Sequence, residues 1–356
     1  MPGIAVCFFL LCSLIPKQDR KPEPFLLKYP SNFGGRFEIP ANNLTTKEGV
    51  ALGRKLFYEK KLSANGQQSC ESCHKQKLAF TDGKAFSEGG DRSLTARSSM
   101  SLANLLWVRN FFWDGRAKSL EEQAIFPLTD AHEMGQSMKV SVARLQNTSV
   151  YPVMFKHAFG SDSIVPEMIV MAISQFERTL ISADSPYDQY LAGKYKPTQQ
   201  ELNGMALFMD GPAPEKKTRG ANCGHCHGGP KTFKELFHNN GLDSVSKDQG
   251  RQKFTGLSDD HGRFRVPTLR NIALTAPYMH DGRFTTLEQV LDHYNEHIKE
   301  SPTLSSFLKN VSNEPDGKSL LLTKTEKTDI VSFLHMLTDT AFVNNPDFSN
   351  PNTKSQ

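Results

Sequence analysis

The sequence predicts an all-α protein made of two tandem domains that are related by internal duplication. Two observations support this prediction. Apolar residues recur at helical spacing along most of the chain, and two blocks of residues repeat at fixed offsets. No sustained alternation of apolar and polar residues argues for a sheet. With 356 residues, the chain is long enough for two domains that each bury a core.

The first repeated block contains a C-x-x-C-H motif, which begins at Cys70 and again at Cys223, 153 residues later. At the same offset, a Thr-x-x-Glu pattern at Thr45 and Thr198 predicts a capping box that begins a helix. Each motif therefore follows a capped amphipathic helix by the same interval.

The second repeated block has an offset of 167 residues. The matching segments are Ser101–Asn104 with Thr268–Asn271, Trp113–Arg116 with His280–Arg283, and Ser119–Glu121 with Thr286–Glu288. The larger offset means that the second half carries 14 extra residues, which we expect in the polar stretch 243–262. Helical periodicity also predicts helices over residues 119–125, 165–181, 286–297 and 325–337.

We expect the two domains to comprise residues 45–190 and 191–344, because Pro and Gly interrupt the pattern near 187–198. Residues 1–20 contain an apolar run that is too short to span a bilayer and is typical of an export signal, although the usual basic residue before it is missing. The alternative is a lipid anchor at Cys12, which would tether the protein to a membrane. Residues 21–44 are expected to be a linker, and residues 345–356 a loose tail.

Charge and cysteine content narrow the class of protein. The formal net charge of +4 is small, and no basic stripe is interleaved with aromatic residues, so we expect no nucleic-acid partner. Four of the six cysteines belong to the two C-x-x-C-H motifs, and the others lie in the N-terminal apolar run. No cysteine is left for a structural disulfide in the folded body.

The C-x-x-C-H motif is typical of covalent haem attachment, in which two thiols form thioethers and the histidine binds iron. The haem-attaching residues are then Cys70, Cys73 and His74 for one haem c, and Cys223, Cys226 and His227 for the other. Zinc bound by two C-x-x-C pairs is the alternative, but it leaves the histidine after each pair unexplained. Each half is therefore predicted to be a helical cytochrome c-like domain with one haem.

The second repeat predicts that the two irons differ on the side opposite these histidines. At the offset of 167, Tyr294 matches Pro127. Proline has no group that binds iron, whereas a tyrosinate does. We therefore expect an open first haem and a second haem closed by Tyr294. Met279 is a rival ligand, and a buried aromatic is the alternative role for Tyr294.

An open haem that reacts with peroxide needs a nearby group that moves a proton between the two oxygens. Glu133 is the candidate, because it lies in the same segment as Gln123 and Pro127. His132 competes for this role, and the alternative for Glu133 is a surface carboxylate.

Several longer motifs point to one family. They are LGRKLF (52–57), SCESCHKQKLAFTDG (69–83), FFWDGRAKSLEEQA (111–124), the Glu133–Met134 pair and VPTLRNIALTAPYMHDGR (266–283). With these motifs the chain resembles the bacterial diheme cytochrome c peroxidases and the MauG-like diheme enzymes over about residues 52–340.

The resemblance implies that His74 binds the peroxide-reacting haem and His227 the haem at which electrons enter. Trp113 matches a tryptophan between the haems, whereas its residue pattern alone favours core packing. The residues that match the distal pocket are Gln123, Pro127 and the catalytic carboxylate Glu133.

Three features depart from the reductively activated peroxidases. The loop 86–94 lacks their distal histidine, so the first haem should be permanently open. Tyr294 stands where those peroxidases have a methionine, and tyrosine at this position is typical of the MauG-like enzymes. Thr275 and Pro277 match residues whose carbonyls bind calcium, but Ser98 or its neighbour replaces the calcium-binding asparagine and is a poorer ligand.

We therefore expect a periplasmic peroxidase that reduces hydrogen peroxide with electrons from a small cytochrome c or a blue-copper protein. The family suggests a homodimer. The first alternative is a MauG-like oxidase that modifies a partner protein through a high-valent state. The second is a diheme electron carrier with two six-coordinate irons.

Overall fold

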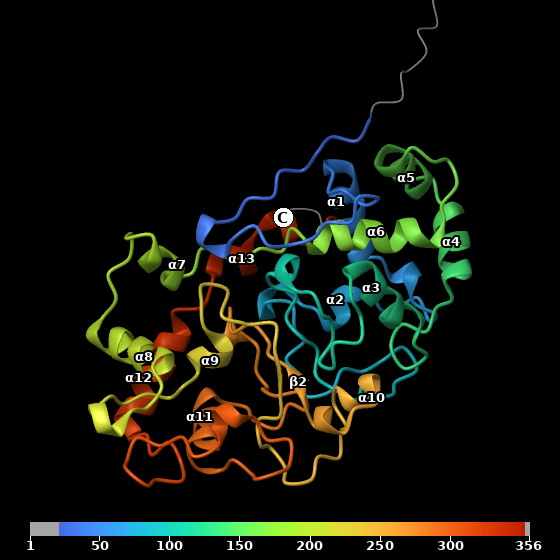
Figure 1. The fold of residues 1–356 in the computed structure, drawn as a ribbon. Helices are drawn as coiled ribbons and strands as arrows, with labels where there is room; N and C mark the ends of the chain where they lie inside the picture. The colour runs from blue at the N-terminus through green and yellow to red at the C-terminus, as the bar shows by residue number, and fades with distance from the viewer. Residues whose placement is uncertain (1–20, 353–356) are drawn as a thin grey trace, which may run out of the picture.

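Helices dominate the computed structural model, which describes residues 21–352 (Figure 1). The strands in this part of the chain are β1 (Phe237–His238) and β2 (Phe264–Arg265), which pair antiparallel with Phe237 opposite Arg265. The all-α prediction is therefore correct apart from this small ladder. Within residues 21–352, no helix has the length and apolar character needed to cross a bilayer. The predicted export signal or lipid anchor lies outside the described residues.

A first group of helices lies at the upper right of Figure 1. Its members are α1 (Lys47–Phe57), α2 (Cys70–Cys73), α3 (Leu120–Thr129), α4 (Met138–Gln146), α5 (Tyr151–Phe159) and α6 (Pro166–Glu177). Helix α1 packs along α6. A Cβ atom at Gly53 would lie 1.8 Å from the Ala172 carbonyl oxygen, so only glycine permits this close crossing.

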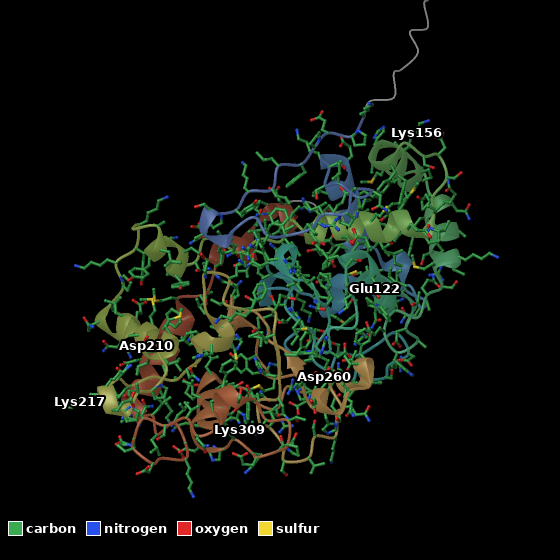
Figure 2. All side chains as sticks on the ribbon, viewed as in Figure 1. Glu122, Lys156, Asp210, Lys217, Asp260 and Lys309 are labelled. Atoms are coloured by element: carbon green, nitrogen blue, oxygen red, sulfur yellow. The ribbon has the colours of Figure 1, made fainter. Side chains whose placement is uncertain are left out.

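A second group lies mainly at the lower left and contains a similar crossing (Figure 1). The later helices are α7 (Pro186–Leu191), α8 (Gln199–Met209), α9 (Gly224–His227), α10 (Gln252–Thr255), α11 (Leu287–Glu296), α12 (Lys324–His335) and α13 (Thr340–Asn344). Helix α8 packs along α12, and a Cβ atom at Gly204 would lie 1.8 Å from the Asp329 carbonyl oxygen. Charged side chains such as Lys217 and Lys309 are exposed on the outer surface (Figure 2).

Several structural features recur at a separation of 167 residues. Helices α3 and α11 are both ten residues long and begin 167 residues apart. The left-handed residues Asn104 and Asn271 have the same separation, and both side-chain amides donate to Ser182, one to its carbonyl and one to its hydroxyl, at 3.0 Å. Ser182 thus accepts hydrogen bonds from an asparagine of each half.

The N-terminal caps of α1 and α8 can be compared with the capping boxes predicted at Thr45 and Thr198. The capping box of Thr198 and Glu201 is confirmed. The prediction for Thr45 is wrong by one residue, because α1 is capped by Thr46, whose hydroxyl accepts the N–H of Gly49 at 3.0 Å. The Thr45 carbonyl instead accepts the Phe25 N–H at 2.9 Å, which holds Thr45 in the preceding extended segment.

Residues 21–44, expected to be a linker, instead pack against the body of the protein. Phe33 is 1% exposed and its ring lies 5.3 Å from that of Trp107, centroid to centroid. The Trp107 indole N–H also donates to the Gly34 carbonyl at 2.9 Å. The prediction failed because Tyr29, Phe33 and Phe37 all pack on Trp107 and anchor a stretch that is otherwise charged and rich in proline.

The prediction of a loose tail over residues 345–356 is also wrong for the part of this segment that the structure describes. Phe348 is 8% exposed, and the Tyr58 hydroxyl donates to its carbonyl at 2.7 Å. Arg54 donates from Nε to the Ser349 carbonyl at 2.7 Å. Residues 345–349 are therefore fixed against α1, because Phe348 buries an aromatic ring within a polar sequence.

Candidate functional site

The first C-x-x-C-H motif forms the short helix α2 and the residue after it. Ser69 and Ser72 make a reciprocal capping box at the start of α2. His74 follows the helix, and its Nδ1 lies 2.7 Å from the Phe80 carbonyl oxygen. With Nδ1–H donating to this carbonyl, Nε2 is left free as a ligand atom. Burial lowers the pKa of His74, which favours the neutral imidazole that metals bind.

The second motif has the same arrangement in and before α9. The Nδ1 of His227 faces the Thr232 carbonyl oxygen at 3.4 Å. Burial lowers the pKa of His227 to about 4, so the imidazole is neutral. The four thiols of the two motifs are unpaired, and burial raises the pKa of Cys223 to about 12 and that of Cys73 to about 11. Both motifs therefore present neutral thiols and a neutral imidazole.

A cavity of about 300 Å³ lies beside the second motif. Its lining includes Cys223, Cys226 and His227 together with Met279 and Tyr294. Apolar side chains from α11 complete much of the wall, among them Leu287 and Leu291. Such a mostly apolar cavity with a few polar groups is typical of a cofactor site.

The two predicted rival ligands, Tyr294 and Met279, meet at Asn240 in this cavity. The Asn240 Nδ2 lies 3.3 Å from the Tyr294 hydroxyl oxygen and 3.3 Å from the Met279 sulfur. Burial raises the pKa of Tyr294 to about 12, while the hydrogen bond from Asn240 opposes this rise. The structure therefore brings both candidates together. Sequence reasoning missed Asn240, because nothing in its local pattern marks it.

Trp113 lies where the segment before α3 meets the segment before α11. Its indole N–H donates to the Ser98 carbonyl at 2.9 Å, and its carbonyl accepts the Arg265 N–H at 2.7 Å. Its ring centroid is 6.5 Å from that of His280. Trp113 also lines the cavity beside the second motif, so it borders both halves of the chain.

The three predicted distal residues gather around the end of α3. Gln123 lies one turn before Pro127 on this helix, and the Pro127 carbonyl accepts the Met134 N–H at 3.0 Å. This turn brings Glu133 back beside α3. The Ala64 N–H donates to the Met134 carbonyl at 2.8 Å, so the turn that carries the half-buried Glu133 lies beside the segment that leads into the first motif. Burial raises the pKa of Glu133 itself.

The rival His132 occupies a different environment. Its side chain is 70% exposed, and Nδ1 lies 2.9 Å from an Asp91 carboxylate oxygen. The loop 86–94 packs on the same turn, because the Gly90 N–H donates to the Glu133 carbonyl at 2.6 Å. Of these two candidates, Glu133 is the more buried side chain.

Comparisons with known proteins agree with the predicted resemblance. A family model described as Di-haem cytochrome c peroxidase matches residues 47–196. The methylamine utilization protein MauG of Methylophilus methylotrophus is 32% identical over 299 residues, which cover 84% of each chain. The chain belongs to the di-haem cytochrome c peroxidase and MauG family. Membership of this family implies two haem cofactors.

Two further family members support the assignment. Cytochrome c551 peroxidase of Nitrosomonas europaea is 35% identical over 291 residues, which are 76% of this chain and 82% of that one. The crystal structure of a MauG-like protein associated with microbial copper homeostasis has a TM-score of 0.80 and 36% identity, and the match covers 92% of this chain and 98% of that one. The overall fold is thus shared with a family member.

The hydrogen-bond partners of the buried Arg265 side chain bear on whether the cavity fits a haem of this family. Its guanidinium donates to the Phe112 carbonyl at 3.3 Å and to the Met100 sulfur at 3.4 Å. Burial lowers its pKa to about 10. A buried cation with such weak acceptors suits the propionate of a haem, so Arg265 and the empty apolar space fit the cofactor. The sequence analysis did not identify Arg265 as a site residue.

The residues expected around calcium lie together in the wall of the cavity. Ser98, Thr275 and Pro277 all line the cavity. The Ser98 hydroxyl donates to the Met279 carbonyl at 3.0 Å, and the Thr275 hydroxyl donates to the Ile272 carbonyl at 3.2 Å. Within residues 21–352, no group of three or more His, Cys, Asp or Glu side chains is placed to hold a metal ion. The ligands that the resemblance implies are backbone carbonyl and hydroxyl oxygens, so the calcium site stays a prediction.

Proposed function

We propose that this protein is a diheme peroxidase that reduces hydrogen peroxide to water. The observation that carries this proposal is at the end of α3, where Pro127 offers no ligand and the half-buried Glu133 lies on a turn beside the segment that leads into the first motif. This combination gives an open coordination position beside an acid–base group. The likeness to a cytochrome c551 peroxidase supports the same reading.

We further propose that residues 45–190 and 191–344 are duplicated cytochrome c domains with one haem c each. The equal length and constant separation of α3 and α11 support the duplication. The paired carbonyl contacts of His74 and His227 support equivalent haem attachment. The attaching residues would be Cys70, Cys73 and His74 in the first domain and Cys223, Cys226 and His227 in the second.

In the proposed reaction, the cofactor supplies electrons and the protein moves the proton and orients the peroxide. When bound, the haem iron supplies the electrons that reduce the O–O bond. Glu133 accepts a proton from one peroxide oxygen and delivers it to the other, which then leaves as water. Gln123 shares the face of α3 with Pro127 and orients the peroxide by hydrogen bonding. His74 would hold the iron through Nε2.

The second haem serves as the relay. Tyr294 lines the same cavity as His227, so it would hold the iron of the second haem and close that iron to peroxide. Electrons enter there from a small cytochrome c or a blue-copper protein and cross near Trp113, which borders both halves. A periplasmic location is proposed from residues 1–20, and a homodimer from the family.

The test compares Glu133→Gln with His132→Gln in protein that carries both haems. Glu133→Gln removes the proton carrier with little change of shape, so we expect peroxidase turnover to fall at least about 100-fold, within the usual range for loss of an acid–base group. His132→Gln changes the exposed neighbour and should keep turnover. Unchanged haem spectra exclude cofactor loss. Full activity of Glu133→Gln would overturn the role.

A MauG-like oxidase that modifies a partner protein is the second candidate. Tyr294 in the cavity and the absence of histidine from the loop 86–94 favour it, as does the likeness to MauG. Peroxide-dependent oxidation of a partner protein without turnover of a small redox donor would establish it. A resting spectrum without high-spin haem would instead establish a pure electron carrier.

A further inference from the structure

The Asn240 side chain contacts both rival ligands of the second haem. Its Nδ2 lies 3.3 Å from the Tyr294 oxygen and 3.3 Å from the Met279 sulfur. All three side chains line the same cavity as Cys223 and His227. One amide group therefore faces two atoms that are both able to bind iron.

The surrounding contacts hold Asn240 in place. Its backbone carbonyl lies 3.0 Å from His293 Nε2. The preceding residue, Asn239, is 4% exposed, and its side chain donates to Thr303 at 2.9 Å and accepts the Gly241 N–H at 2.9 Å. These contacts hold the backbone on both sides of Asn240, whose side chain lines the cavity.

The chemistry of the two acceptors is unequal. An amide N–H donates well to an oxygen that carries negative charge, whereas a thioether sulfur is a weak acceptor. A soft thioether on a histidine-ligated haem also raises the reduction potential. A donor at this position therefore favours the oxygen ligand and the ferric iron.

We propose that Asn240 is a positioning residue that selects the ligand of the second haem. Its Nδ2–H donates to the Tyr294 oxygen, so that Tyr294 rather than Met279 binds the iron. The inference rests on the proposed assignment of Tyr294 as the ligand. Removing the donor would weaken ligation by the Tyr294 oxygen and let the Met279 sulfur bind in its place, and the released Tyr294 oxygen would take up a proton from solvent. No covalent bond within the protein changes in this exchange.

The test uses Asn240→Leu in the purified protein with both haems bound, because leucine keeps the approximate shape and lacks the donor. The readouts are the low-spin ferric EPR signal, the long-wavelength sulfur-to-iron charge-transfer band and the reduction potential of the second haem. We expect the sulfur band to appear and the ferric-to-ferrous equilibrium to shift at least tenfold toward ferrous iron, which is about 59 mV for one electron. Unchanged spectra and potential would overturn the proposal.

Two further variants separate the possible outcomes. Asn240→Leu combined with Met279→Leu should lose the sulfur band, and persistence of the band would contradict the assignment to Met279. Asn240→Ala tests the same loss of the donor if the leucine variant fails to fold, and it should show the same sulfur band. An unchanged spectrum in this variant would also overturn the proposal.

Tyr294→Phe distinguishes failure of this inference from failure of its premise. An altered low-spin signal in Tyr294→Phe, with Asn240→Leu unchanged, would reject the role of Asn240 alone. An unchanged signal in Tyr294→Phe would reject Tyr294 as the ligand, and the role of Asn240 with it. A change in both variants supports the proposal.

Discussion

Trp113 and His280 lie edge to face with their ring centroids 6.5 Å apart, although 167 residues separate them in the sequence. On its other side, His280 stacks on Phe264 at 3.8 Å. The Trp113 indole is held by its hydrogen bond to the Ser98 carbonyl. Corresponding positions of the two repeated blocks therefore touch each other, at the contact between the two halves.

This contact predicts a role for Trp113 in electron transfer between the haems. Replacing Trp113 with Leu removes the aromatic ring, and we expect the transfer rate in single-turnover stopped-flow measurements to fall at least tenfold. Trp113→Phe should retain most of the rate. The matched control is Trp107→Phe, which alters the buried tryptophan that packs on Phe33. Equal rates in Trp113→Leu and the unchanged protein would reject the pathway.

The assignment of Tyr294 predicts a spectroscopic change at one haem. Tyr294→His should replace the oxygen ligand with nitrogen, so the low-spin signal in resting EPR should change while the high-spin signal of the first haem stays the same. Met279→Leu is the control, because the proposed resting state does not use its sulfur. A low-spin signal that changes only in Met279→Leu would assign the ligand to Met279 instead.

The buried carboxyl of Glu177 predicts an unusual dependence of stability on pH. It is 5% exposed, and burial raises its pKa to about 8. Because the folded protein holds this proton more tightly than the unfolded chain, stability should fall as pH rises from about 4.5 to 8. One pKa unit corresponds to about 1.4 kcal/mol, so Glu177→Gln should stabilise the protein by a few kcal/mol above pH 8.

The measurement for Glu177 is denaturant unfolding of the diheme protein at pH 5 and pH 8.5. The variant should gain stability relative to the unchanged protein mainly at the higher pH. Glu122→Gln, on the exposed side of α3, is the control and should change little at either pH. A gain for Glu177→Gln that is the same at both pH values would show that the carboxyl titrates normally.

The crossing of α1 and α6 predicts a strong effect of a single methyl group. In Gly53→Ala the new Cβ would meet the Ala172 carbonyl at 1.8 Å, so the helices must separate. We expect a loss of about 1–3 kcal/mol in the free energy of unfolding, as for other overpacked sites. Gly35→Ala is the matched control, since its Cβ would meet nothing within 4 Å. Equal stability of the two variants would show that α1 shifts freely.

Local patterns in the sequence predicted much of this protein. Helix α11 and the cap at Thr198 follow from periodicity and from residues three positions apart, which interact within one turn. The haem motifs were equally visible, because their cysteines and histidine are adjacent in the chain. Local reasoning failed at Thr45, where a backbone hydrogen bond from Phe25 moves the helix start by one residue.

The sequence by itself therefore determined the helical class, the repeated blocks, the two C-x-x-C-H motifs and the family. The tertiary structure decided which distant residues meet. It packed Phe33 and Phe348 into the core, set Trp113 against His280, and placed Asn240 between Tyr294 and Met279. The physical reason is range: a motif or a cap acts over a few residues, whereas a cavity is lined by segments that only the complete fold brings together.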